Sequence, residues 1–269
     1  MNNKKTNKVT VTLIVVAVIL VAILAGLLFF VKSNGTPEET VPPTVPVETV
    51  PPTDAPTEAP TEAPTEPPVT EPPMLPHVAG LYEKNNDIAG WIRIDDTEID
   101  YPFVYTPNER NKYLYMDIDG DHSYGGSIIL DERCTVDPES TNIILHGHNM
   151  KNGSMFNNLM LFEKESYWKE HRTIYYSNLY EEREYEIIAA YRDRVVMPEE
   201  KGFKFYEFTN PESEEEFNEA MKYIMDRAPY DTGIKAEYGD RLLLLVTCAY
   251  HTQNGRFIVV AKEVTEKAE

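Results

Sequence analysis

Cysteine is scarce in this sequence: only Cys134 and Cys248 occur among 269 residues. Two cysteines can form at most one bridge, so neither a disulfide framework nor a multi-cysteine zinc site can be built. Positive charge is scarce as well, because the formal net charge is −20 and no basic run occurs beyond the extreme N-terminus. Such a chain repels a phosphate backbone, which argues against nucleic acid as a partner.

Proline is almost confined to one stretch, since 14 of the 20 prolines fall between residues 33 and 77. This distribution leaves one candidate globular part, residues 78–269. A domain of that length can bury a sizeable core without disulfides or a structural metal ion.

A long uncharged apolar segment covers residues 9–31 and contains 23 residues. As a helix it would rise about 34 Å, enough to cross a bilayer. A cleaved signal peptide would have a shorter apolar region, of about 7 to 15 residues, so we expect an uncleaved transmembrane anchor. Three lysines precede the segment and one follows it directly, which places residues 1–8 in the cytoplasm and the rest of the chain outside the cell.

Residues 32–77 contain a short Thr-Glu-Ala-Pro repeat and almost no large apolar side chains. A segment of this composition cannot form a core, so we expect a disordered, acidic extracellular stalk. At the polyproline limit of about 3.1 Å per residue, it would reach up to about 140 Å. A mucin-like glycosylated stalk and a proline-rich ligand remain alternatives.

The remaining sequence alternates short apolar runs with turn signals, which is typical of a mainly β domain. Within 211–228, Phe217, Met221, Ile224 and Met225 recur at helical spacing, and 154–172 predicts two short helices. The continuous apolar runs at 241–250 and 256–264 favour central strands buried on both faces. We therefore expect a closed or nearly closed β-barrel with peripheral helices. Its other strands are expected near Trp91 and at 99–105, 126–134, 142–149, 173–179 and 184–193.

Two residues with nucleophile and base chemistry stand at expected strand ends. Cys248 ends one apolar run, where a catalytic group can meet solvent, although a free cysteine is often buried and inert. His148 follows another apolar run, and a histidine is the usual partner that converts a thiol of pKa about 8.5 into a thiolate. His146 shares its face by strand alternation, so spacing alone does not separate the two histidines.

Arg256 begins the next strand, eight residues after Cys248. A hairpin could therefore bring its guanidinium beside the thiol, where it could donate hydrogen bonds to an oxyanion or to a substrate carbonyl. The alternative is an ordinary arginine at a strand edge.

These residues lie in two segments, VTCAYHTQNGRFIVVAK and NIILHGHNMKNGSMF, that resemble the two signature regions of sortases. The segment from 90 to 133 is similar to the N-terminal half of class B sortases, and the resemblance covers nearly all of residues 80–264. It implies a membrane-anchored cysteine transpeptidase of Gram-positive bacteria with an eight-stranded barrel. Class B members carry an N-terminal helix and a helix before the cysteine strand, for which 78–88 and 211–228 are the candidates.

Carried over by position, the resemblance assigns catalysis to Cys248, His148 and Arg256 and makes His146 a bystander. Some class B members have an acid between the cysteine and the arginine that orients the histidine, but this chain has none there. An acidic third catalytic residue therefore stays unassigned. No metal ion or organic cofactor is implied.

The resemblance also assigns two residues next to the cysteine. Thr247 would help to shape the substrate groove, and the backbone N–H of Ala249 would help to hold the oxyanion.

The implied reaction cleaves a C-terminal sorting signal of secreted proteins after threonine, through a thioester. An amine of a peptidoglycan precursor (lipid II) or of a pilin lysine then receives the acyl group. Two alternatives remain: the same site could act mainly as a hydrolase, or the domain could be a non-catalytic cell-surface binding module.

Two further features have structural interpretations. The Asp-rich run from Asp117 to Asp121 suggests a calcium loop, but Gly120 stands fourth, where an EF-hand needs its glycine sixth and a glutamate twelfth. We therefore expect a turn. Cys134 has no Gly-His neighbour in the sequence and is expected to be a free structural cysteine.

Overall fold

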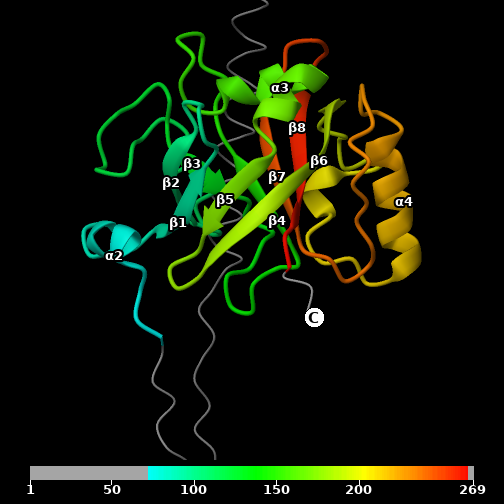
Figure 1. Ribbon diagram of the computed structural model, residues 1–269. Coiled ribbons are helices and arrows are strands. Elements are labelled where there is room, and N and C mark those ends of the chain that lie inside the picture. The colour runs from blue at the N-terminus through cyan, green and yellow to red at the C-terminus, as the bar shows by residue number, and fades with distance from the viewer. Residues whose placement is uncertain (1–71, 266–269) are drawn as a thin grey trace, which may run out of the picture. The chain divides into compact units, whose positions relative to one another are not determined.

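The computed structural model describes residues 72–265, and its strands form a closed barrel in the order β1-β2-β3-β4-β7-β8-β6-β5 (Figure 1). The prediction of a closed, eight-stranded, mainly β barrel is confirmed. The strands are β1 (Ile88–Arg93), β2 (Asp100–Val104), β3 (Ile128–Leu130), β4 (Asn142–His146), β5 (Thr173–Ser177), β6 (Glu182–Arg194), β7 (Leu242–Cys248) and β8 (Gly255–Glu263).

The predicted membrane anchor falls outside this part of the chain. The expected transmembrane segment at 9–31 and the stalk up to residue 71 lie outside the described residues. Between residues 72 and 265, no helix has the length and apolar character needed to cross a bilayer.

The arrangement that positions the site is the parallel pairing of β4 with β7, in register from Asn142 opposite Leu242 to His146 opposite Val246. β7 lies between β4 and β8 and is buried from Leu242 to Thr247, as its continuous apolar run predicts. Because β4 and β7 are parallel, their carboxyl ends meet at the same end of the barrel. Residues that follow β4 therefore lie beside the last residue of β7.

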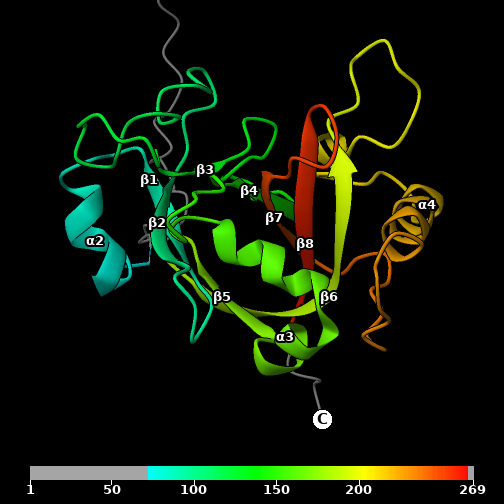
Figure 2. The same ribbon diagram turned by 90° about the horizontal axis from the view of Figure 1, so that it is seen from above.

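Helices pack around the barrel. Seen from above, α2 (Pro76–Tyr82) lies beside β1 and α4 (Glu214–Met225) lies on the opposite side, next to β6 (Figure 2). α4 occupies most of the predicted helical region, and the Ser213 side chain caps it by accepting from the Glu216 amide at 3.2 Å. α2 starts at Pro76, two residues before the expected helix, because proline at the first position loses no helical hydrogen bond.

Two other regions partly follow the expectation. The expected short helices at 154–172 form as the 3-10 helix η1 (Asn157–Glu163) and as α3 (Glu165–Glu170). The strand expected at 126–134 is only three residues long, because the chain turns after Leu130. In that turn Asp131 accepts a backbone hydrogen bond from Cys134 at 3.0 Å, and its side chain accepts one from the Arg133 amide at 2.9 Å.

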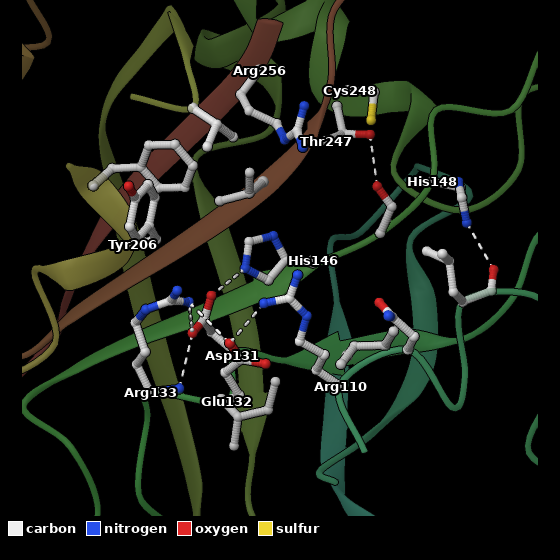
Figure 3. Close-up of a pocket in the computed structure, with 18 of the residues that line it drawn as sticks. Arg110, Asp131, Glu132, Arg133, His146, His148, Tyr206, Thr247, Cys248 and Arg256 are labelled. Carbon is white, nitrogen blue, oxygen red and sulfur yellow. Dashed lines mark hydrogen bonds and ion pairs between the residues drawn. The ribbon is translucent and has the colours of Figure 1, made fainter. Parts of the chain in front are cut away.

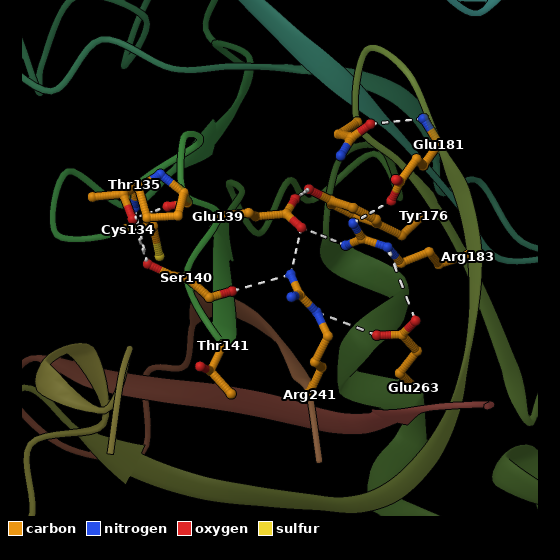
Figure 4. Close-up of polar contacts among 12 residues, drawn as sticks. Cys134, Thr135, Glu139, Ser140, Thr141, Tyr176, Glu181, Arg183, Arg241 and Glu263 are labelled. Carbon is orange, nitrogen blue, oxygen red and sulfur yellow. Dashed lines mark hydrogen bonds and ion pairs between the residues drawn. The ribbon is translucent and has the colours of Figure 1, made fainter. Parts of the chain in front are cut away.

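A polar network ties together strands at the end of the barrel away from Cys248 (Figure 4). Glu139 is its centre and accepts from the Tyr176 hydroxyl at 2.8 Å, from Arg183 at 2.5 Å and from Arg241. Glu263 pairs with the same two arginines. The network thus connects the β3–β4 loop to β5, β6, β8 and the residue directly before β7.

Candidate active site

Cys248 is the last residue of β7 and pairs directly with Arg256 of β8. The hairpin between them is tight, since a Cβ atom at Gly255 would lie 2.1 Å from the Ala249 carbonyl oxygen. Only glycine fits there, and Asn254 before it adopts a left-handed conformation with φ of 55°. The short hairpin therefore sets the arginine beside the cysteine, as the sequence predicted.

His148 lies two residues beyond β4, in the chain that leaves the barrel next to Cys248. Gly147 allows this path, because a Cβ atom there would lie 2.6 Å from Phe156 and 2.7 Å from Ile128. The Gly147 carbonyl accepts a hydrogen bond from the Thr247 hydroxyl at 2.8 Å. This hydrogen bond joins the two segments at Gly147 and Thr247, the residues directly before His148 and Cys248.

The orientation of the His148 ring comes from the β2–β3 loop. Its Nε2 lies 2.9 Å from the Leu114 carbonyl oxygen, and its ring stacks on Tyr115 with a centroid distance of 5.7 Å. A carbonyl can only accept, so Nε2 must carry a proton and donate it. Nδ1 is then the nitrogen that can exchange a proton with a substrate or a thiol.

Asn149 makes a further link between the two segments. Its side-chain amide donates to the Cys248 carbonyl at 2.8 Å, and its side-chain oxygen accepts from Asn157 at 2.6 Å. No sequence motif singled out this residue, although it directly follows the candidate histidine. Its contacts fix the backbone of the cysteine relative to that of the histidine.

A pocket of ≈ 560 Å³ connects these residues, and Cys248, His148 and Arg256 lie together along its rim (Figure 3). Thr247 and His146 also line the pocket, so the side chains expected from the sequence for catalysis and for the substrate groove gather there. The resemblance makes His146 a bystander in catalysis, and its ring lines the same pocket as Cys248 and His148. It bonds Asp131, which sequence analysis did not identify as a site residue, at 2.7 Å.

The hydrogen-bond donors expected for an oxyanion are the Ala249 amide and the Arg256 guanidinium. The Ala249 amide already donates to the Gly255 carbonyl at 3.0 Å, within the hairpin. That amide is therefore engaged in this conformation, and its oxyanion role stays a prediction. Arg256 uses only Nη1 for contacts with the turn, to Asn254 and Gly255. In residues 72–265 its Nε–H and Nη2–H donors have no partner, so they can serve an oxyanion.

The other cysteine, Cys134, is held in its protonated, unreactive form. Cys134 is buried and unbridged, as expected, and burial raises the pKa of its thiol to about 12, with the nearby Asp131 and Glu139 charges adding to the increase. The Asp117 side chain accepts from the amides of Asp119 and Asp121 at 3.1 and 2.9 Å. This is the expected turn.

The pKa of Asp131 is shifted downward, whereas the pKa of Cys134 is shifted upward. Burial would raise the pKa of its carboxyl, but the hydrogen bond and charge of His146, together with Arg133, outweigh burial and hold the pKa below its usual value. The residue is therefore a buried carboxylate with two engaged oxygens. A buried charge of this kind needs such partners to be tolerated.

In the part of the chain that the structure describes, His148 Nδ1 and two of the Arg256 nitrogens have no hydrogen-bond partner, and both residues lie near Cys248 at one end of the barrel. A nucleophile with such a histidine and such an arginine defines a cysteine acyl-transfer site. Comparison with known families matches residues 92–264 to the sortase domain. The chain belongs to the sortase family, whose members are cysteine transpeptidases.

Within that family the chain is a class B sortase. It is 31% identical to sortase B of Listeria monocytogenes over 188 residues, which are 69% of this chain and 73% of that protein. It is 28% identical to sortase B of Staphylococcus aureus over 189 residues, 70% of this chain and 74% of that one. The structure of the Staphylococcus aureus sortase B–substrate complex superposes with a TM-score of 0.63 at 26% identity, covering 72% of this chain and 87% of that chain.

Proposed function

We propose that this transpeptidase cleaves the C-terminal sorting signal of secreted proteins after threonine and transfers the acyl group to an amine through a thioester on Cys248. The observation that carries the proposal is the shared strand end at which Cys248, His148 and Arg256 line one pocket. Sortase B of Staphylococcus aureus has been solved with a substrate, and a similar sortase B structure holds triglycine. These relatives support a peptide substrate for the family.

In the first step the Cys248 thiolate attacks the threonine carbonyl carbon. The carbonyl oxygen becomes an oxyanion that accepts hydrogen bonds from the Nε–H and Nη2–H groups of Arg256. The C–N bond then breaks, and protonated His148 gives its Nδ1 proton to the leaving amine. A thioester on Cys248 and a neutral His148 remain.

The second step reverses this proton flow. Neutral His148 takes a proton through Nδ1 from an incoming amine, which attacks the thioester carbon. A new amide bond forms, and the Cys248–carbon bond breaks to regenerate the thiolate and the imidazolium. Throughout both steps, the Leu114 carbonyl keeps the other ring nitrogen engaged, so one histidine nitrogen performs both proton transfers.

The acceptor is proposed to be the amine of a peptidoglycan precursor (lipid II) or a pilin lysine. The sequence supports a membrane location, with residues 1–8 in the cytoplasm, 9–31 as a single-pass anchor and the catalytic domain outside the cell. In that arrangement the site meets secreted chains as they leave the membrane. No metal ion or organic cofactor takes part in the proposed steps.

The test uses the purified full-length chain in detergent with internally quenched peptides that contain Leu-Pro-x-Thr-Gly, Asn-Pro-x-Thr-Asn or Ser-Pro-x-Thr-Gly. Products are identified by mass spectrometry with and without an added amine. We expect cleavage after threonine, a trapped thioester on Cys248 and an amine adduct, all lost in Cys248→Ala.

The outcomes separate the alternatives. Free acid as the main product even with excess amine would identify a hydrolase. Retained peptide binding with no turnover in both the native chain and Cys248→Ala would identify a binding module and contradict the proposal.

A further inference from the structure

The chain that carries His148 closes on itself directly after β4. The Phe156 amide donates to the His148 carbonyl at 2.9 Å, and Asn149 forms an isolated β-bridge with Met155. Met155 lies in the left-handed region with φ of 58°, which lets the chain turn back at this point. The loop from 148 to 157 therefore has a closed neck, and His148 and Asn149 form one side of it.

The Asn149 side chain reaches from this neck to the cysteine strand, and its amide has only one satisfactory orientation. The Cys248 carbonyl can only accept, so Nδ2 of Asn149 must face it, at 2.8 Å. Oδ1 then faces Asn157, the first residue of η1, whose Nδ2 donates to it at 2.6 Å. Both ends of the amide are engaged, and neither bond survives if the amide is turned over.

The series of hydrogen bonds continues through the cysteine. The Cys248 carbonyl and the Ala249 N–H belong to the same peptide group, and that N–H donates to the Gly255 carbonyl at 3.0 Å. Because a peptide group is planar, Asn149 and Gly255 together fix its orientation. Gly255 directly precedes Arg256, so the same contacts also hold the start of the arginine strand.

These contacts form one series of hydrogen bonds, which we call the amide chain: Asn157, Asn149, the Cys248–Ala249 peptide and Gly255. It contains the neighbour of His148, the cysteine itself and the residue before Arg256. The amide chain thus connects the backbone segments that carry all three residues of the proposed site. Hydrogen bonds in such a series strengthen one another, because each donation polarises the next group.

The sheet alone does not hold the cysteine against the histidine segment. The pairing of β4 with β7 ends at His146. The Thr247 hydroxyl then bonds the Gly147 carbonyl, one residue short of the cysteine. Beyond that point Asn149 makes the contact that reaches Cys248 itself. A side chain therefore continues the connection where the strand ladder stops.

We propose that Asn149 is a positioning residue for the acyl-transfer reaction and that it keeps Cys248 and Arg256 in register with His148 through the amide chain. It acts through its neighbours rather than on the substrate. Nucleophilic attack and proton transfer need close spacing, and a displacement of about 1 Å that begins away from the chemistry can lower a rate about 100-fold. This inference rests on the proposed function, because it concerns the same reaction.

The experiment measures kcat and KM of the full-length chain in detergent with the best cleaved peptide. Asn149→Ala removes both hydrogen bonds and should lower kcat about 10-fold or more, with KM changed less than about 3-fold, because Asn149 does not line the pocket. Asn149→Asp keeps the size and the bond from Asn157 but sets an oxygen against the Cys248 carbonyl, so it should lower kcat further. Asn157→Ala removes only the outer bond and should lower kcat about 3-fold.

Two readouts separate positioning from a purely structural role. In the double variant of Asn149→Ala with Asn157→Ala, kcat should equal that of Asn149→Ala alone, because Asn157 acts through Asn149 and effects within one network are not additive. The pH at which iodoacetamide alkylation of Cys248 is half-maximal should rise by about half a pH unit or more in the Asn149 variants, since a displaced His148 stabilises the thiolate less. A loss of stability alone would produce neither result.

Asn152 supplies the matched control. It lies in the same loop and is exposed, and its Oδ1 accepts from the Ser154 amide and hydroxyl at 3.2 and 2.7 Å. Asn152→Asp keeps both acceptor contacts and adds the same charge as Asn149→Asp. It should leave kcat and the alkylation profile unchanged. An equal fall in kcat for both aspartate variants would assign the effect to charge and overturn the inference.

A native kcat and a native alkylation profile in Asn149→Ala, shown to be folded by circular dichroism, would overturn the inference, as would multiplicative effects in the double variant. If Asn149→Ala does not fold, Asn157→Ala decides, because an unchanged kcat in that folded variant also overturns it. In each case the native chain still cleaves peptide and the proposed function stands. Failure of the folded native chain to cleave any peptide would instead overturn the proposed function, and this inference with it.

Discussion

His148 donates a hydrogen bond from Nε2 to the backbone carbonyl of Leu114, 2.9 Å away and 34 residues earlier in the chain. In many cysteine and serine enzymes an acidic or amide side chain orients the histidine in this way. Here the group that orients the histidine is a backbone carbonyl. The site therefore does not need an acid between Cys248 and Arg256 for this purpose. A carbonyl fixes the ring orientation without adding a negative charge beside the thiolate.

The stacking of Tyr115 on the His148 ring leads to the first prediction. Tyr115→Ala removes the aromatic face and should lower kcat about 3- to 10-fold, while Tyr115→Phe, which keeps the stack, should retain nearly full activity. The measurement is kcat and KM against pH with the best peptide. We expect the pH profile to change in the alanine variant only, since a freed ring changes its proton-transfer geometry. Identical profiles for both variants would show that the stack does not position the histidine.

Arg256 carries the second prediction. Arg256→Lys should lower kcat about 100-fold with little change in KM, because removing an oxyanion donor has an effect of this order. A lysine ammonium cannot bind the hairpin carbonyls and also reproduce the planar Nε and Nη2 donors. The rate of Cys248 alkylation should change much less than kcat. If lysine supports a third or more of the native kcat, the planar donor set is not required.

The two cysteines should differ sharply in reactivity, which is the third prediction. Burial raises the pKa of Cys134 to about 12, so at pH 8 only about one thiol in 10⁴ is ionised. Iodoacetamide should therefore add one alkyl group per native chain, at Cys248. Intact-mass and peptide mapping should show no labelling of native Cys248→Ala and full labelling of Cys134 in denaturant. Labelling of Cys134 at a rate similar to Cys248 in the native chain would contradict the buried, protonated thiol.

The elements that the sequence predicted correctly are those whose residue pattern lies within one short segment. The apolar runs of β7 and β8 predicted two buried central strands. The same kind of pattern placed Cys248 at the end of a strand, and it placed His148 at the end of β4, which in the structure stops two residues earlier. α4 was predicted from Phe217, Met221 and Ile224, which form its buried face.

The parts that were missed depend on contacts between distant residues. Leu114 acts through its backbone carbonyl, which leaves no side-chain signal in a sequence. Asp131 was read as part of a strand, because it follows the apolar residues of β3 directly, and its bond to His146 joins residues 15 positions apart. The engaged amide of Ala249 depends on the closure of the hairpin at Gly255, which spacing alone does not fix.

The network at the far end of the barrel gives the fourth prediction. Glu139→Gln leaves Arg183 and Arg241 facing a neutral amide in a region where the Glu139 and Arg183 side chains are only 13% and 14% exposed. Removing one partner of such a buried pair should lower the free energy of unfolding by about 3 kcal/mol, because the remaining charges lose their compensation. Urea denaturation of the full-length chain, followed by tryptophan fluorescence, measures this change.

Glu181→Gln is the matched control, because Glu181 pairs with the same Arg183 but its side chain is 63% exposed. Water screens that pair, so its loss should cost less than about 1 kcal/mol. Equal effects of the two substitutions would mean that the network is effectively solvated. A larger effect at Glu139, with native kcat/KM below the unfolding transition, would show that this network stabilises the barrel without shaping the site at its other end.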